Sequence, residues 1–186
     1  MLDRAIEIVN VLNGIAKLEV ENWENIRVAG VAREEPNGTR TQILFAESIR
    51  SRSRMGGNLT ITRADGGVET TTDNILEAFA DLASRDINVS RALRLFGSRT
   101  PTWVSLYKVY EIIETEVDSG GLANRSWASK NRIRSFKQTA NSVSAAGDEA
   151  RHGSEPNEPP RSPMSLAEAE SLISGLLKNW LRSKQK

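Results

Sequence analysis

Apolar residues recur every three or four positions over much of the chain, which is the spacing of an amphipathic helix. Residues 2–18 show this pattern first, and residues 73–118 show it again in three successive segments. A further helix is predicted at residues 127–143. The last one begins after Ser165, where Glu168 completes a capping box. The pattern therefore predicts helices in most of the chain outside residues 24–72.

Within residues 73–118, polar residues mark where each helix should begin. Asp73 is the expected N-cap of the first helix, and Asn88 or Ser90 that of a second, shorter one that ends at Gly97. Thr100-Pro101 opens the third and clearest helix.

Residues 24–72 have a different pattern, rich in β-branched residues and broken by turns. The predicted strands are Asn25–Arg33, Thr41–Arg50, Asn58–Arg63 and Val68–Thr72. Pro36-Asn37-Gly38 and Asp65-Gly66-Gly67 suit hairpin turns. They predict either a four-stranded antiparallel meander or a longer hairpin followed by a shorter one.

These elements predict an α+β fold. An N-terminal helix and a small antiparallel β-meander, residues 1–72, are expected to pack on a C-terminal helical bundle, residues 73–186. A sheet this small is marginal alone, which is why we expect it to pack on the helices. Four of the six prolines fall between residues 156 and 163, so a proline-rich loop is predicted at residues 153–163.

Composition removes several kinds of chemistry. The chain of 186 residues has no cysteine, one histidine and a net charge of +1. The lack of cysteine excludes disulfides, thiolate metal sites and a cysteine nucleophile. We predict no metal site and no cofactor. No stretch has the length or apolarity of a signal peptide or a membrane span, so a cytoplasmic protein without a membrane partner is expected.

Positive charge is concentrated between Leu122 and Ser154, where six basic residues face two acidic ones. Lys130, Arg134 and Lys137 share one face of the helix predicted at residues 127–143, and Asn141 continues the row. Such a face can contact the phosphates of a nucleic acid. A solvated helix face explains the same pattern without a ligand.

The only histidine lies in the segment GDEARHG, residues 147–153. Here His152 could exchange a proton, Arg151 could hold a phosphate, and Asp148 or Glu111 could orient the histidine. This set fits metal-independent RNA cleavage, and it also fits simple anion binding. A third interpretation is structural, in which Arg151 and His152 attach the proline-rich loop to the helices.

Two other groups of residues have mainly structural interpretations. Arg50, Arg52 and Arg54 alternate, so they would share one face of a strand and protect a sheet edge from aggregation. The aromatic residues at helical spacing are predicted to belong to the core. These are Trp103, Tyr107, Tyr110, Trp127, Phe136 and Trp180.

About 80 C-terminal residues resemble a known family. The runs LYKVYEIIETEVD (106–118), SKNRIRSFKQTAN (129–141), GDEARHG (147–153) and PMSLAEAESLI (163–173) resemble uncharacterised bacterial proteins with HEPN-like, abortive-infection-type C-terminal domains. The resemblance implies a helical bundle, often dimeric, and in many members a ribonuclease of toxin–antitoxin or anti-phage systems. The family's site pairs an arginine with a histidine four to six residues later. Here Arg151 directly precedes His152.

Two functions therefore stand side by side. One is a HEPN-like, metal-independent ribonuclease of a bacterial defence system, which uses Arg151 and His152 on an RNA substrate. The alternative is a non-catalytic protein-interaction or dimerisation module in which the GDEARHG loop is structural. Its partner would be a second copy or a cognate protein.

Overall fold

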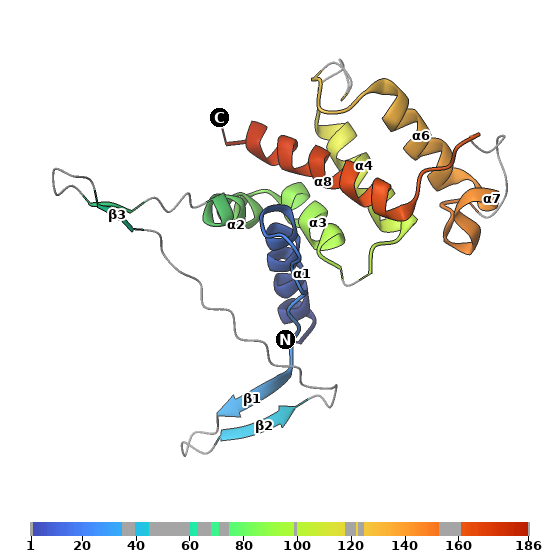
Figure 1. Ribbon diagram of the computed structural model, residues 1–186. Helices are drawn as coiled ribbons and strands as arrows, with labels where there is room; N and C mark the ends of the chain where they lie inside the picture. Colours follow the sequence, from blue (N-terminus) through green and yellow to red (C-terminus); the bar gives the residue numbers. More distant parts are fainter. Residues whose placement is uncertain are drawn as a thin grey trace.

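The computed structural model describes residues 2–34, 40–44, 60–62, 68–70, 75–98, 100–117, 122, 125–152 and 161–185. This part of the chain is mostly helical (Figure 1). The helices are α1 (Leu2–Glu19), α2 (Ile75–Arg85), α3 (Ile87–Phe96), α4 (Trp103–Glu116), α6 (Lys130–Asn141), α7 (Val143–Ala146), the 3₁₀ turn η1 (Gly147–Glu149) and α8 (Leu166–Ser183). The strands are β1 (Gly30–Glu34), β2 (Arg40–Leu44), β3 (Thr60–Thr62) and β4 (Val68–Thr70).

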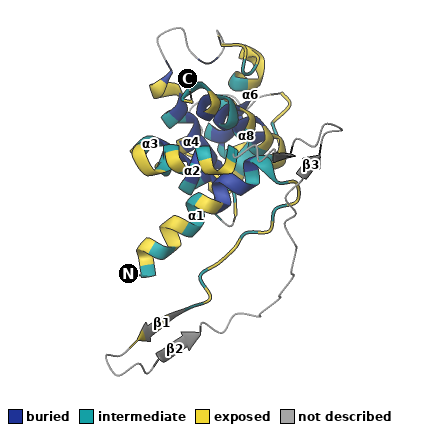
Figure 2. Cartoon of the chain, turned by 90° about the vertical axis from the view of Figure 1, so that its left-hand side faces the viewer, coloured by how far each residue is buried: buried dark blue, intermediate teal, exposed yellow. Residues whose placement is uncertain are grey.

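One hydrophobic core joins the helices. α3 packs between α1 and α4, α8 covers α4, and α2 and α6 lie at the margins of this group. The apolar stripes of these helices face one another, so their side chains are buried inside the bundle (Figure 2). The largest fully buried side chains include Trp180, Tyr110, Phe79 and Phe136.

The α+β prediction is wrong, because the described chain is a helical bundle rather than a sheet packed on helices. Among the strands that the structure describes, β1 pairs with β2 and β3 with β4, both antiparallel, so these four do not form one meander. Figure 1 shows both hairpins lying apart from the helices. The reason is a shortage of apolar residues. This applies to β3 and β4, which contain one large apolar residue each, Ile61 and Val68, too little to hold a sheet on a bundle.

Helix ends follow capping rules, but some differ from the predicted positions. α6 begins at Lys130 after the N-cap Ser129, later than the predicted residue 127. The predicted N-cap Asp73 lies outside the described residues. The capping box of α8 is confirmed, since Ser165 and Glu168 bond reciprocally. α3 is capped by Asp86 and not by Asn88 or Ser90. The Asp86 carboxylate accepts from the backbone N–H groups of Asn88 and Val89, at 2.9 and 3.1 Å. Helix α3 therefore begins earlier than its apolar stripe indicates.

The contact between α1 and α3 depends on two glycines. A Cβ atom on Gly14 would overlap the carbonyl oxygen of Leu93, and one on Gly97 would overlap the carbonyl oxygen of Asn10. The two backbones therefore approach more closely than any larger residue allows. This approach fixes where α1 crosses α3.

α1 shares its core with the helices that follow residue 73, because Ile15 and Leu18 belong to the same buried cluster as Leu93. The domain boundary at residue 72 stays a prediction. The proline-rich loop predicted at residues 153–163 lies largely outside the described residues. The described part of it is Arg161, Ser162 and Pro163. Among the helices described, none is both long and apolar enough to cross a membrane.

Candidate functional site: two cation–aromatic–carboxylate units on α4

Helix α4 carries two tyrosines and two glutamates in a repeated arrangement. Tyr107 and Glu111 are four residues apart, and so are Tyr110 and Glu114, so each pair shares a face one helical turn apart. The capping box between Thr102 and Ser105 fixes the start of the helix. Both tyrosines are buried, whereas Glu111 is half-buried and Glu114 is exposed. The helix thus carries two units, each made of a tyrosine ring and a glutamate carboxylate: Tyr107 with Glu111, and Tyr110 with Glu114.

Arg151 fills the first of these two units. Its Nη2 donates to Glu111 Oε1 at 2.7 Å. Its guanidinium carbon lies 4.4 Å from the centre of the Tyr107 ring. An arginine that stacks on an aromatic face while it bonds a carboxylate is held by two attractive interactions at once.

Lys137 of α6 fills the second unit. Its Nζ lies 3.7 Å from Glu114 Oε1 and 5.4 Å from the centre of the Tyr110 ring. The Tyr110 hydroxyl donates to the same Glu114 carboxylate. Burial, followed by this bond to a carboxylate, raises the pKa of Tyr110 well above its ordinary value, so the phenol stays neutral.

An aromatic cluster forms the floor under both units. The ring of Phe136, which is fully buried on α6, lies 5.7 Å from each of the Tyr107 and Tyr110 rings and 6.2 Å from Trp103. These contacts hold α6 on α4. The prediction that the helically spaced aromatics belong to the core is confirmed for these four residues and Trp180, and Trp127 is half-buried.

Backbone bonds fix the segment that carries Arg151. The Arg151 N–H donates to the carbonyl of Ala140 at 2.8 Å, so the segment folds back onto the end of α6. Gly147 makes the turn with a φ of 64°, a conformation that glycine adopts most readily. Farther along the chain, the Met164 N–H donates to the buried hydroxyl of Thr139 at 3.0 Å. The chain is therefore attached to α6 both before and after residues 153–160.

The structure brings together three of the four predicted catalytic residues. Arg151 Nη1 lies 3.3 Å from His152 Nε2, and Glu111 bonds the same guanidinium. Glu111 thus orients Arg151 and not His152. Asp148 is exposed on η1 and makes none of the contacts that join the other three residues.

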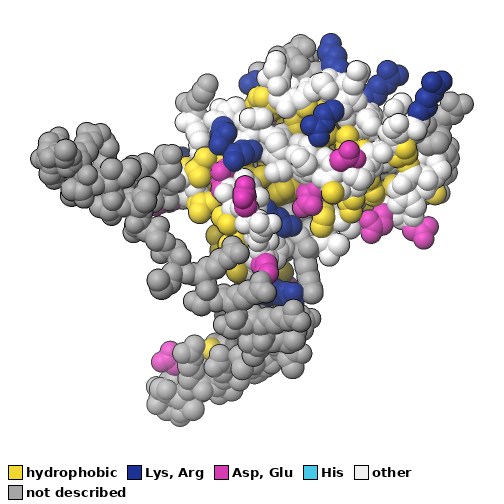
Figure 3. All heavy atoms as spheres, in the orientation of Figure 1, with side chains coloured by type: hydrophobic (Ala, Val, Ile, Leu, Met, Phe, Trp, Pro, Cys, Tyr) yellow, Lys and Arg dark blue, Asp and Glu magenta, His cyan; other side chains and the backbone are white. Residues whose placement is uncertain are grey.

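The predicted basic row is divided by these contacts. Lys130 and Arg134 are exposed, but Lys137 is half-buried beside Glu114. Asn141 ends the row with its Oδ1 buried and without a hydrogen-bond partner. Figure 3 shows Lys and Arg side chains gathered over the end of the molecule where α6 lies in Figure 1. Of the three cations predicted to form this row, Lys130 and Arg134 are therefore the two that remain exposed to solvent.

The sequence interpretation missed Glu114 and the tyrosine rings as partners of the cations. The signal was present in α4, where each tyrosine is followed four residues later by a glutamate. Nothing in the spacing shows which cation joins each pair, because Arg151 is 40 residues from Glu111. Arg50, Arg52 and Arg54 lie outside the described residues.

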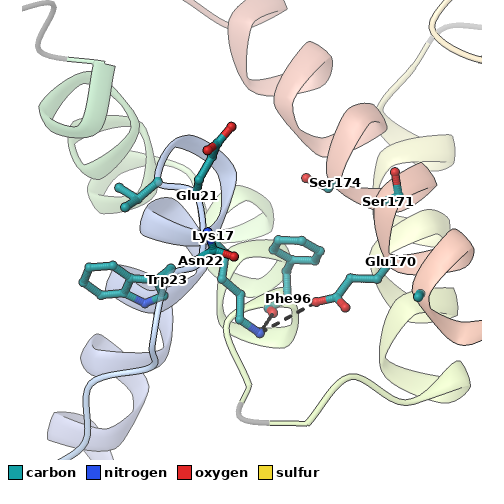
Figure 4. A pocket seen from close by; sticks show the side chains of 10 residues that line it. Lys17, Glu21, Asn22, Trp23, Phe96, Glu170, Ser171 and Ser174 are labelled. Atoms are coloured by element: carbon teal, nitrogen blue, oxygen red, sulfur yellow. Dashed lines mark hydrogen bonds and ion pairs between the residues drawn. The ribbon is translucent and has the colours of Figure 1, made fainter.

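A second candidate is a shallow hollow between the end of α1 and α8 (Figure 4). Lys17, Trp23, Phe96 and Glu170 line it. The Lys17 ammonium donates to the carbonyls of Phe96 and Ser98, at 3.5 and 3.1 Å, and lies 3.9 Å from Glu170. Burial lowers the pKa of Lys17, although Glu170 opposes this shift. The donors of this cation are already used within the protein, so the hollow offers no open anion site.

Within the described ranges, no group of three or more histidine, aspartate and glutamate side chains is placed to hold a metal ion. No protein-family model, curated protein or solved structure matches the chain. The resemblance to HEPN-like domains therefore stays a prediction that rests on the sequence runs quoted above.

Proposed function

We propose that the chain is a non-catalytic interaction module in which Arg151 acts as a structural clasp. One observation carries this proposal. The Arg151 guanidinium bonds Glu111 at 2.7 Å and stacks over Tyr107, so its charge is already paired with a carboxylate of the same chain. The clasp attaches the Gly147–His152 segment to α4.

The alternative use of Arg151, to hold a phosphate, requires that the guanidinium leave Glu111. A phosphate placed beside Arg151 would also lie close to the Glu111 carboxylate. The two negative charges would repel each other. The neighbouring cation Lys137 has a carboxylate of its own in Glu114. The two units are thus close to electrically neutral, which favours attachment over anion capture.

A HEPN-like ribonuclease is the second candidate function, and a separate observation favours it. Arg151 and His152 are both exposed, and their side chains are adjacent at 3.3 Å. A general acid–base group beside a cation is what metal-independent RNA cleavage needs. In this case Lys130 and Arg134 would guide the RNA.

A thermodynamic experiment tests the clasp. We expect Arg151→Met to lower the free energy of unfolding by about 1 kcal/mol, because a partly exposed ion pair and a cation–π contact are lost together. In a double-mutant cycle, Glu111→Gln should lower the free energy of unfolding only slightly further once Arg151 has been replaced by methionine. Urea unfolding of the four proteins measures this coupling.

Arg134→Met is the matched control. Arg134 is exposed on α6, so its substitution should change the unfolding free energy by less than about 0.5 kcal/mol. If Arg151→Met were no more destabilising than Arg134→Met, and showed no coupling to Glu111, the clasp would be rejected.

A further inference from the structure

The N-terminal half of α1 leaves a wide apolar face uncovered. Ile6, Ile8 and Leu12 are 42%, 53% and 43% exposed, and all lie in the first 11 of the 18 residues of this helix. Figure 2 shows this half extending away from the other helices. Leu2, Ala5 and Val9 are half-buried between the exposed residues. Exposed apolar residues that adjoin in this way mark an interaction surface more often than isolated ones do.

The face points away from the bundle. α3 packs on the side of α1 that carries Glu7, Asn10 and Gly14, through the glycine contacts and an ion pair between Glu7 and Arg94. On an α-helix, six of the seven apolar residues from Leu2 to Leu12 cover an arc of about 160° on the opposite side. The seventh, Val11, lies outside this arc and packs against the core. No charged residue from Leu2 to Leu12 falls within the arc, and its exposed members Ile6, Ile8 and Leu12 are all apolar.

Counted outward from Glu7, the apolar residues of this face lie at the same distances on the two sides. Leu2 corresponds to Leu12, Ala5 to Val9, and Ile6 to Ile8. If two such helices lie antiparallel with their centres at Glu7, every apolar residue meets an apolar residue of the other copy. A surface that is complementary to itself in this way suits a two-fold symmetric dimer, in which both copies use the same patch.

We propose that α1 is the dimerisation surface of this protein and that its occupant is the α1 helix of a second copy in antiparallel orientation. This inference rests on the proposed function, since it names the partner of the interaction module. The apolar face is about 16 Å long, which gives less buried area than the roughly 1,000 Å² of a stable interface. The expected dimer is therefore weak and forms at micromolar concentrations.

Sedimentation equilibrium of the full chain tests the proposal. Between about 1 and about 300 µM, the average mass should rise from that of one chain, 20.5 kDa, toward twice that value. Ile8→Glu and Leu12→Glu should each weaken the dimer at least tenfold, because a carboxylate would be buried in the interface. Ile87→Glu is the control, since Ile87 is 82% exposed at the start of α3, outside the proposed face.

The same experiment contains the results that would overturn the proposal. One is a monomer at every concentration, which would leave the face to a different protein. Another is a dimer that Ile8→Glu and Leu12→Glu leave unchanged, provided that circular dichroism shows both variants folded. Failure of the Arg151 clasp would not change the mass, so the two proposals fail separately.

Cysteine cross-linking tests the orientation, because the chain has no cysteine of its own. In the antiparallel pair, residue 5 of one copy lies opposite residue 9 of the other. A mixture of Ala5→Cys and Val9→Cys chains should therefore form mixed disulfide dimers faster than either variant forms dimers alone. Faster cross-linking of each variant with itself would overturn the antiparallel arrangement.

Discussion

Replacing Gly14 by alanine is expected to lower the free energy of unfolding by about 3 kcal/mol or more, although alanine is the better helix former. The added methyl group would overlap the Leu93 carbonyl oxygen and lie 2.9 Å from its carbon. Both atoms belong to the backbone of α3, so no side chain can rotate to make room. α1 would have to move away from α3, with loss of the contacts around Ile15 and Leu18.

Gly175→Ala is the matched control, because Gly175 also lies inside a helix but a Cβ atom there meets nothing within 4 Å. At that position alanine is simply the better helix former, so the substitution should stabilise the protein by about 0.5–1 kcal/mol. Urea unfolding of both variants measures the contrast. If Gly14→Ala also proved stabilising, the close crossing of α1 and α3 would be wrong.

The second large effect is expected at Phe136. Phe136→Ala should lower the free energy of unfolding by about 3–5 kcal/mol, since a fully buried ring is removed and the cavity can close only partly. The ring also contacts the rings of Tyr107, Tyr110 and Trp103, so its loss affects the floor under both cation units. Thermal or urea unfolding, followed by circular dichroism, measures the change.

Ile133→Ala on the same helix supplies the comparison. Ile133 is only half-buried at the edge of the core, so its truncation should cost about 1 kcal/mol. Equal losses for the two variants would contradict the central position of Phe136 between α4 and α6.

The six longer helices of the described residues were predictable from the sequence because each has an apolar stripe of its own, whereas the short elements α7 and η1 were not predicted. The stripe and capping box of α8 are local signals, and the structure places that helix at Leu166–Ser183 after Ser165. The sheet was not predictable in the same way. β-branched residues favour short strands locally, but a packed sheet needs an apolar face that continues from strand to strand. Segments such as TIT and VET do not provide one.

The candidate site was predictable only in part. The residue types at Arg151 and His152 drew attention to the segment that carries this cation, and the adjacency of the two side chains follows from their position in the chain. The ion pair with Glu111 depends on how the segment after α7 folds back onto α6, which no local pattern encodes. The same holds for Lys137, whose helical row indicated a shared face but not the carboxylate of Glu114 beside it.

The measurement that tests the central claim most directly is an RNA cleavage assay. Mixed cellular RNA is incubated in EDTA with the wild-type chain and, in parallel, with His152→Ala. Because Arg151 is used as a clasp, we expect the RNA to remain intact in both samples. Cleavage by the wild type that disappears in a folded His152→Ala variant would contradict the clasp and establish a His152-dependent ribonuclease.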